Sequence, residues 1–238
     1  MDQLLVALDV DSASRARSLA DQLRGAVGGF KIGNELFTNV GPSIVEELAG
    51  RGDRVFLDLK FHDIPNTVVK ASAAATRLGV WMFNLHAANG SATMRAARAI
   101  AHEEAARLSR PAPLVIAVTV LTSFDEATLR ETGVAKPIAG QVEHLATLAS
   151  AAGLDGVVVS PLEIALIRAT CGQRVAIVTP GIRGSGDAKG DQTRTMTAAQ
   201  ALAAGATYIV VGRPITAAAD PRAAAERLAA ECRAAHAV

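Results

Sequence analysis

The strongest constraint on the fold is an alternation of short, continuously apolar runs with longer alanine-rich stretches. Strands buried on both faces of a parallel sheet are continuously hydrophobic, and alternation with helices is typical of a sheet wound with helices. The predicted strands span Leu4–Asp9, Gly29–Ile32, Val55–Lys60, Met82–His86, Leu114–Thr119, Gly156–Ser160, Ala176–Thr179 and Tyr208–Gly212.

Amphipathic or alanine-rich segments between these strands predict the helices. Eight strands favour an α/β fold of the closed (β/α)8 type, a TIM barrel, with 1–238 as a single domain. Periodicity alone also fits an open, doubly wound sheet. The predicted helices span Ala13–Arg24, Pro42–Arg51, Val68–Leu78, Ala92–Ala106, Gln141–Ala152, Leu162–Ala169, Ala198–Ala203 and Pro221–Ala234.

Polar side chains at the ends of the predicted strands decide between the two folds. In a barrel the carboxyl ends of the strands converge on one mouth, where such enzymes carry their active sites. The distribution therefore favours a barrel with a site at that mouth. The polar residues are Asp9, Lys31, Asp58 with Lys60, His86, Thr122 just beyond the fifth strand, and Arg213 after the eighth.

The segment Asp58-Leu59-Lys60-Phe61-His62-Asp63 places an acid, a lysine and a second acid at the end of one apolar strand. Alternation along a strand directs Asp58 and Lys60 to one face and their apolar neighbours to the other. Ionised groups there are costly to desolvate unless they pair or meet a charged ligand. The segment predicts a chemical site, and the alternative is an ion network that only holds a loop.

Two glycine-containing segments predict how a ligand is held. After the eighth strand, a turn at Gly212 and Arg213 could face an anion, and barrels often bind phosphate after strands seven and eight. After the seventh strand, a polar segment with several glycines predicts a lid that brings Arg183 or Gln192 to the ligand. The alternatives are a solvated arginine and an exposed loop.

Composition and charge argue against several function classes. A net charge of +1 and an aromatic content of 3% offer neither a basic stripe nor stacking platforms, so no nucleic-acid partner is expected. The apolar runs are too short to span a bilayer, and no basic region precedes one at the start. We expect a soluble cytoplasmic protein with no membrane partner. Cys171 and Cys232 lack Cys-x-x-Cys spacing, so reduced structural thiols are expected.

These residues together resemble the orotidine 5′-phosphate decarboxylases of the bacterial type, and the resemblance runs the length of the chain. The Asp-x-Lys-x-x-Asp core is shared with sugar-phosphate decarboxylases and synthases of the same superfamily. The Ile-Pro-Asn-Thr continuation and the Gly-Asp-Gln segment make the narrower assignment specific. The matching segments are Ala7-Leu8-Asp9, Phe30-Lys31-Ile32-Gly33, Asp58 to Thr67, Val120-Leu121-Thr122-Ser123, Thr179-Pro180-Gly181-Ile182-Arg183, Gly190-Asp191-Gln192 and Val211 to Thr216.

The resemblance implies decarboxylation of orotidine 5′-monophosphate to uridine 5′-monophosphate in de novo pyrimidine biosynthesis, with no cofactor and no metal. It implies that Lys60 donates a proton to the carbon that loses carbon dioxide, and that Asp58 lies beside the substrate carboxylate. Lys31, Asp58, Lys60 and Asp63 would form an alternating charge array. A homodimer is also implied, in which Asp63 and Thr67 reach into the neighbouring subunit's site.

The resemblance also assigns substrate contacts. Asp9 and Lys31 would hold ribose hydroxyls, and Thr122 would contact the pyrimidine. Gln192 would bridge base and phosphate, while Arg183, Gly212 and Arg213 would serve the phosphate. The whole substrate-binding set is Asp9, Lys31, Asp58, Thr67, Thr122, Pro180, Arg183, Gln192, Gly212 and Arg213.

Two other functions fit the same barrel. A metal-dependent sugar-phosphate decarboxylase or synthase would bring carboxylate or histidine ligands to the mouth, where Lys31 and Lys60 stand instead. His62 and His86 are the histidines that such a site could use. A non-catalytic phosphate-binding barrel would need the Arg213 end alone, so the presence of Lys60 with its flanking acids favours catalysis.

Overall fold

The computed structural model describes residues 2–182 and 195–234. Within these ranges eight parallel strands follow one another around a closed barrel, and the last pairs with the first. The predicted barrel is confirmed, and the pairing of the first and last strands excludes the open sheet. The strands are β1 Leu4–Ala7, β2 Gly29–Gly33, β3 Val55–Phe61, β4 Met82–His86, β5 Leu114–Val118, β6 Gly156–Val158, β7 Ala176–Thr179 and β8 Tyr208–Val211.

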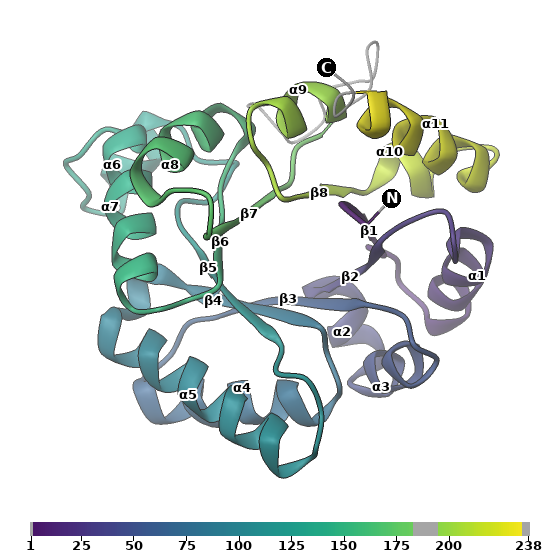
Figure 1. Cartoon of the computed structure of the whole chain (residues 1–238), viewed down its shortest axis with the longest axis horizontal. Helices are drawn as coiled ribbons and strands as arrows, with labels where there is room; N and C mark the ends of the chain where they lie inside the picture. The colour runs from purple at the N-terminus through teal and green to yellow at the C-terminus, as the bar shows by residue number, and fades with distance from the viewer. Residues whose placement is uncertain (1, 183–194, 235–238) are drawn as a thin grey trace.

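Helices surround the strands as an outer ring (Figure 1). Every predicted helix is present, although the ends move by a few residues. Short segments that were not predicted are α2, η1, α6 and α10. No helix in the described ranges is long and apolar enough to cross a membrane. The helical segments are α1 Ala13–Leu23, α2 Asn34–Val40, α3 Ser43–Gly50, α4 Pro65–Arg77, η1 Ala87–Asn89, α5 Ser91–Arg107, α6 Glu126–Glu131, α7 Ile138–Ala151, η2 Pro161–Glu163, α8 Ile164–Cys171, α9 Ala198–Ala203, α10 Arg213–Thr216 and α11 Pro221–Ala234.

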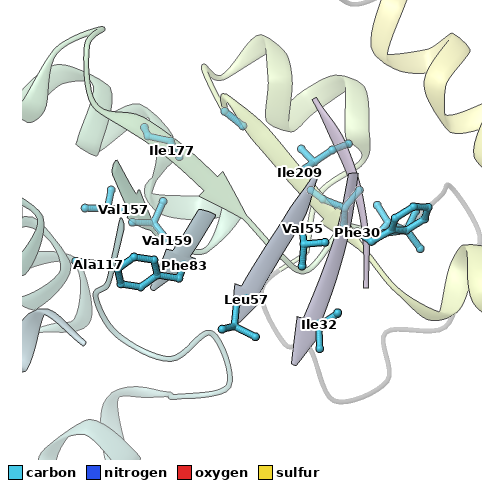
Figure 2. Close-up of a cluster of buried hydrophobic side chains, with 14 of the residues drawn as sticks. Phe30, Ile32, Val55, Leu57, Phe83, Ala117, Val157, Val159, Ile177 and Ile209 are labelled. Carbon is cyan, nitrogen blue, oxygen red and sulfur yellow. The ribbon is translucent and has the colours of Figure 1, made fainter. Parts of the chain in front are cut away.

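Alternate strand residues fill two apolar layers. Outward-facing side chains such as Ile32, Leu57 and Phe83 pack between the strands and the helices (Figure 2). Burial on both faces explains why the strands read as continuous apolar runs. The inner layer fills the barrel interior below the carboxyl ends of the strands. Polar side chains at those ends therefore lie next to a layer of apolar atoms. It consists of Leu5, Ala7, Phe56, Met82, Ile116, Val178 and Val210.

Candidate active site

A cavity of about 580 Å³ opens among residues at the carboxyl ends of the strands. Its lining combines the polar residues that follow several strands with apolar side chains of the inner layer. Predicted site residues far apart in sequence therefore meet in one place. Those that line the cavity are Asp9, Lys31, Asp58, Lys60, Thr122, Pro180, Gly212 and Arg213.

Four of these side chains form a chain of alternating charge. Lys31 Nζ lies 2.9 Å from Asp9 Oδ1 and 3.4 Å from Asp58 Oδ2. The other oxygen of Asp58, Oδ1, accepts a hydrogen bond from Lys60 Nζ at 2.8 Å. Asp58 thus stands between two ammonium groups, and Lys60 is the more exposed of the two, with 30% of its side chain accessible against 10% for Lys31.

The environment of Lys31 keeps it charged. Burial lowers the pKa of its ammonium, but the charges of Asp58 and Asp9 more than offset that effect, so the pKa of Lys31 lies above its ordinary value. Gly33 follows on the same face of β2. A Cβ at this position would lie 2.8 Å from Lys31 Nζ and 3.1 Å from Asp9 Oδ1. The glycine therefore leaves room for the Lys31–Asp9 ion pair.

The backbone of β3 is not the regular strand that the sequence predicted. Lys60 has φ 54°, in the left-handed region that residues other than glycine rarely occupy. The pairing with β4 also shifts register between Leu57 and Phe61. The shift adds two residues to β3, an even number, so Asp58 and Lys60 still face the cavity while Leu57 and Phe61 pack in the outer layer.

The Gly212–Arg213 segment is the start of a helix and not the turn that the sequence predicted. Gly212 precedes α10, and Arg213 is its first residue. Pro214 follows within the first turn, where a missing N–H costs least. This short helix places Arg213 at the cavity wall, on the opposite side of the β1–β8 seam from the Asp9–Lys31 pair.

The comparisons with known proteins agree on one family. A model of the orotidine 5′-phosphate decarboxylase / HUMPS family matches residues 2–228. The chain belongs to this family. An orotidine 5′-phosphate decarboxylase from Moorella thermoacetica is 55% identical over 231 residues, which cover 97% of this chain and 92% of that protein. One from Syntrophotalea carbinolica is 52% identical, with coverage of 98% and 96%.

Two solved structures share the fold of this chain. The enzyme of that name from Lactobacillus acidophilus superposes with a TM-score of 0.85 at 37% identity, covering 96% of this chain and 98% of that one. An uncharacterized conserved protein from Geobacillus kaustophilus superposes with a TM-score of 0.84 at 39% identity, with coverage of 96% and 99%. Family membership confirms the resemblance seen in the sequence.

Not every residue that the decarboxylase resemblance singled out lies at the cavity. Asp63 lies two residues before α4 and Thr67 lies in its first turn. Both are exposed and lie outside the cavity lining. Asn89 Oδ1 accepts a hydrogen bond from the Asp63 N–H at 3.3 Å, and Asn89 Nδ2 donates to the Phe61 and His86 carbonyls at 2.8 Å each. Asn89 therefore holds this segment of the chain in place. Arg183 and Gln192, with the predicted lid, lie outside the described residues.

Several residues at the cavity were not singled out from the sequence. Gly33 could have been found because it stands two residues after Lys31 on the same strand face. Others carry no signal in the sequence, since an apolar inner-layer residue such as Phe56 looks like any core residue. The additional lining residues are Ala7, Gly33, Asn34, Glu35, Phe56, Val158, Val178, Gly181, Val210 and Thr216.

The imidazole rings of His62 and His86 contact each other near Lys60. Their ring centroids are 5.2 Å apart. Burial, followed by the charges of His62 and Lys60, lowers the pKa of His86 to about 4. The ring is neutral at neutral pH. Within the described ranges no group of three or more His, Cys, Asp or Glu side chains is placed to hold a metal ion.

The depressed pKa of His86 predicts a loss of stability in mild acid. The unfolded chain takes up a proton near the ordinary pKa of 6.5, whereas the folded chain does so near 4. The contribution of neutral His86 is therefore complete above pH 6.5 and is lost as pH falls towards 4. Urea unfolding at several pH values across this range should show that His86→Asn loses less stability than the wild type as pH falls. The slopes of the unfolding free energy against pH should differ by an amount that corresponds to up to about one proton per molecule.

The matched control for this experiment is His144→Asn, at an exposed position of α7. It should retain the wild-type slope. If the unfolding free energy of the wild type and of His86→Asn fell equally steeply between pH 6.5 and 4, His86 would not be the cause of the loss of stability in acid.

Proposed function

We propose that this protein decarboxylates orotidine 5′-monophosphate to uridine 5′-monophosphate, without a cofactor, in de novo pyrimidine biosynthesis in the cytoplasm. The observation that carries the proposal is the Asp58–Lys60 contact of 2.8 Å at the cavity. It occurs in a chain that is 55% identical to the orotidine 5′-phosphate decarboxylase from Moorella thermoacetica. The charge array, the cavity and the family membership support the same reaction.

Lys60 supplies the chemistry in this proposal. Loss of carbon dioxide from a pyrimidine carbon leaves a poorly delocalised carbanion, so a fixed positive charge at that carbon stabilises the transition state more than the ground state. The Lys60 ammonium is held by Asp58 and lines the cavity. Once carbon dioxide has left, the same ammonium gives its proton to the carbanion, and the neutral product forms.

Asp58 and Lys31 set the charge around Lys60. A carboxylate beside the departing carboxylate favours the state in which that second negative charge has left. Lys31 Nζ lies 3.4 Å from the other Asp58 oxygen, so the negative charge of Asp58 is paired on both sides. Asp9 and Lys31 are joined at 2.9 Å and can present a carboxylate and an ammonium to ribose hydroxyls.

In this proposal the phosphate group of the substrate binds at Gly212 and Arg213. A guanidinium forms strong, paired hydrogen bonds with phosphate oxygens, and barrels commonly bind phosphate after their last two strands. Pro180 after β7 and Thr122 after β5 line the same cavity and complete the proposed contacts to phosphate and pyrimidine. Arg183 and Gln192 are proposed to join them from the segment outside the described residues.

The proposed active form is a homodimer, with Asp63 and Thr67 completing the partner's site. Both are exposed and lie away from their own chain's cavity. Ile64, next to Asp63, is 67% exposed, and Leu162 is the one other large apolar side chain that is exposed in the described part of the chain. Burial of Ile64 against a second copy would remove that surface from water and bring Asp63 to the neighbouring subunit.

A direct assay tests the proposed reaction. The purified chain is incubated with orotidine 5′-monophosphate in excess chelator, and the loss of ultraviolet absorbance is followed. Turnover that is unaffected by the chelator is expected. Turnover that depends on added divalent metal, or release of carbon dioxide from a sugar phosphate instead, would favour the metal-dependent relatives. Binding without any turnover would favour a phosphate-binding barrel.

Arg213→Ala should separate phosphate binding from the chemistry. Loss of a charged hydrogen-bonding partner costs on the order of 2–5 kcal/mol, and part of that binding energy serves the transition state. KM should therefore rise and kcat fall with the nucleotide. With orotidine, which lacks phosphate, the variant should be nearly as slow as the wild type, because the deleted contact has no partner there.

Arg222→Ala is the control for this comparison, since Arg222 is an exposed arginine of α11 that pairs with Glu226. It should leave both substrates unaffected. If Arg213→Ala slowed nucleotide and nucleoside by the same factor, Arg213 would be supporting the cavity generally, and the phosphate assignment would be wrong.

A further inference from the structure

One amide side chain inside the barrel contacts both members of the Asp58–Lys60 pair. Asn84 of β4 is 1% exposed. Its Oδ1 accepts a hydrogen bond from the backbone N–H of Lys60 at 2.8 Å, and its Nδ2 donates to Asp58 Oδ1 at 2.7 Å. The same Asp58 oxygen accepts from Lys60 Nζ at 2.8 Å. Asn84 therefore links the backbone of the lysine to the carboxylate that its ammonium contacts.

Asn84 lies where the pairing between β3 and β4 is interrupted. Leu57 is opposite Phe83, and the next pair is Phe61 with Leu85. Asn84 is the β4 residue between these two pairs, and it faces the extra residues of β3. An extra residue in a strand leaves its backbone groups without ladder partners. The side-chain oxygen of Asn84 supplies the acceptor that the Lys60 N–H would otherwise lack.

The conformation of Lys60 needs such support. A φ of 54° at a residue with a Cβ is strained, and strained backbone persists where the surrounding contacts determine it. The described contacts that hold the backbone and the head group of Lys60 pass through Asn84 and Asp58. A buried polar group with a partner on each side is also the arrangement that fixes a single geometry.

We propose that Asn84 is a positioning residue for decarboxylation, which holds Lys60 in its left-handed backbone conformation and orients Asp58 towards the lysine ammonium. The proposal rests on the function proposed above. Asn84 is absent from the cavity lining, so it acts through Asp58 and Lys60 and not by touching substrate. An apolar residue at this position would leave the Lys60 N–H and one Asp58 hydrogen bond unsatisfied.

Asn84→Ala should lower kcat by about 100-fold, because a displacement of a reacting group by about 1 Å costs that much. KM should stay within about threefold of the wild type, because the contacts to phosphate and ribose are untouched. Met82→Ala is the matched control, since Met82 is a fully buried, inward-facing residue of the same strand. It should lower the denaturation midpoint without a comparable loss of kcat.

Hydrogen exchange of the Lys60 amide, measured by NMR, tests the proposal without any substrate. In the wild type this N–H is held by Asn84, so it should exchange slowly. In Asn84→Ala it should exchange at least about tenfold faster, while the amide of Leu57 and the Lys60 amide of Met82→Ala keep their protection. This result stands even if the wild type fails to decarboxylate the nucleotide, so the two proposals fail separately.

Asn84→Asp separates the two hydrogen bonds of the amide. It retains an oxygen for the Lys60 N–H but sets a second carboxylate against Asp58. Protection of the Lys60 amide should be largely restored, while kcat remains low. A purely structural role is indicated, and the proposal overturned, if Asn84→Ala and Met82→Ala lose kcat equally or if Lys60 amide exchange is unchanged in Asn84→Ala.

Discussion

Replacing Lys60 with alanine is expected to lower turnover of orotidine 5′-monophosphate by about 10⁴-fold or more, because it removes both a transition-state charge and the proton donor. The folded structure should survive. Asp58 retains the Lys31 ammonium at 3.4 Å and the Asn84 amide at 2.7 Å, so its carboxylate is not left as an uncompensated buried charge. Steady-state kinetics and a thermal melt on the same preparation measure the two effects.

The control for this variant is Lys70→Ala, at an exposed position on α4, in the element that follows β3. Its turnover should equal that of the wild type. If Lys60→Ala kept a tenth of the wild-type turnover, Lys60 would be neither the proton donor nor the main source of the field, and the proposed function would lose its central residue.

The barrel was predictable because its strands are buried on both faces. All eight apolar runs became strands, with β4 and β7 matching the predicted bounds and most others ending earlier. The short helices were missed for a physical reason. A segment such as α2 or α6 has too few turns to show helical periodicity, and α10 contains a proline within its first turn, which reads as a turn signal in sequence.

The gathering of polar residues at one mouth was also predictable, since parallel strands in a barrel end at one side. The geometry of Lys60 was not. Sequence alternation put Asp58 and Lys60 on one face, and that outcome holds because the irregularity in β3 adds two residues and preserves the parity. The local sequence around a lysine predicts neither a positive φ nor a register shift.

Asn84 shows what sequence reasoning could have added. It is the polar residue within the otherwise apolar Met82–Leu85 run, and a buried amide requires partners for both its donor and its acceptor. That requirement points to a neighbouring polar strand, but it does not say which atoms are joined. The His86–Asn89 segment is similar, because the role of Asn89 in holding the Asp63 turn depends on carbonyls brought together by the fold.

Recovery of activity from two inactive variants is the second large effect expected of this protein. Lys60→Ala and Asp63→Ala chains are each expected to be inactive as homodimers. In a mixed dimer of the proposed kind, one site has Lys60 from one chain and Asp63 from the other, so it is intact. After random exchange, about one quarter of all sites should be active, because half of the dimers are mixed and each carries one native site.

A mixture of Lys60→Ala with Asp58→Ala provides the control for this experiment. These two residues contact each other at 2.8 Å within one chain, so no mixed dimer can hold a site with both. Subunit exchange should then restore nothing. The exposed position of Asp63 and the exposed Ile64 beside it are the structural reasons to expect the opposite result for Asp63. If exchange is verified by mass spectrometry and the Lys60→Ala and Asp63→Ala mixture stays inactive, Asp63 serves its own chain, and the composite site is wrong.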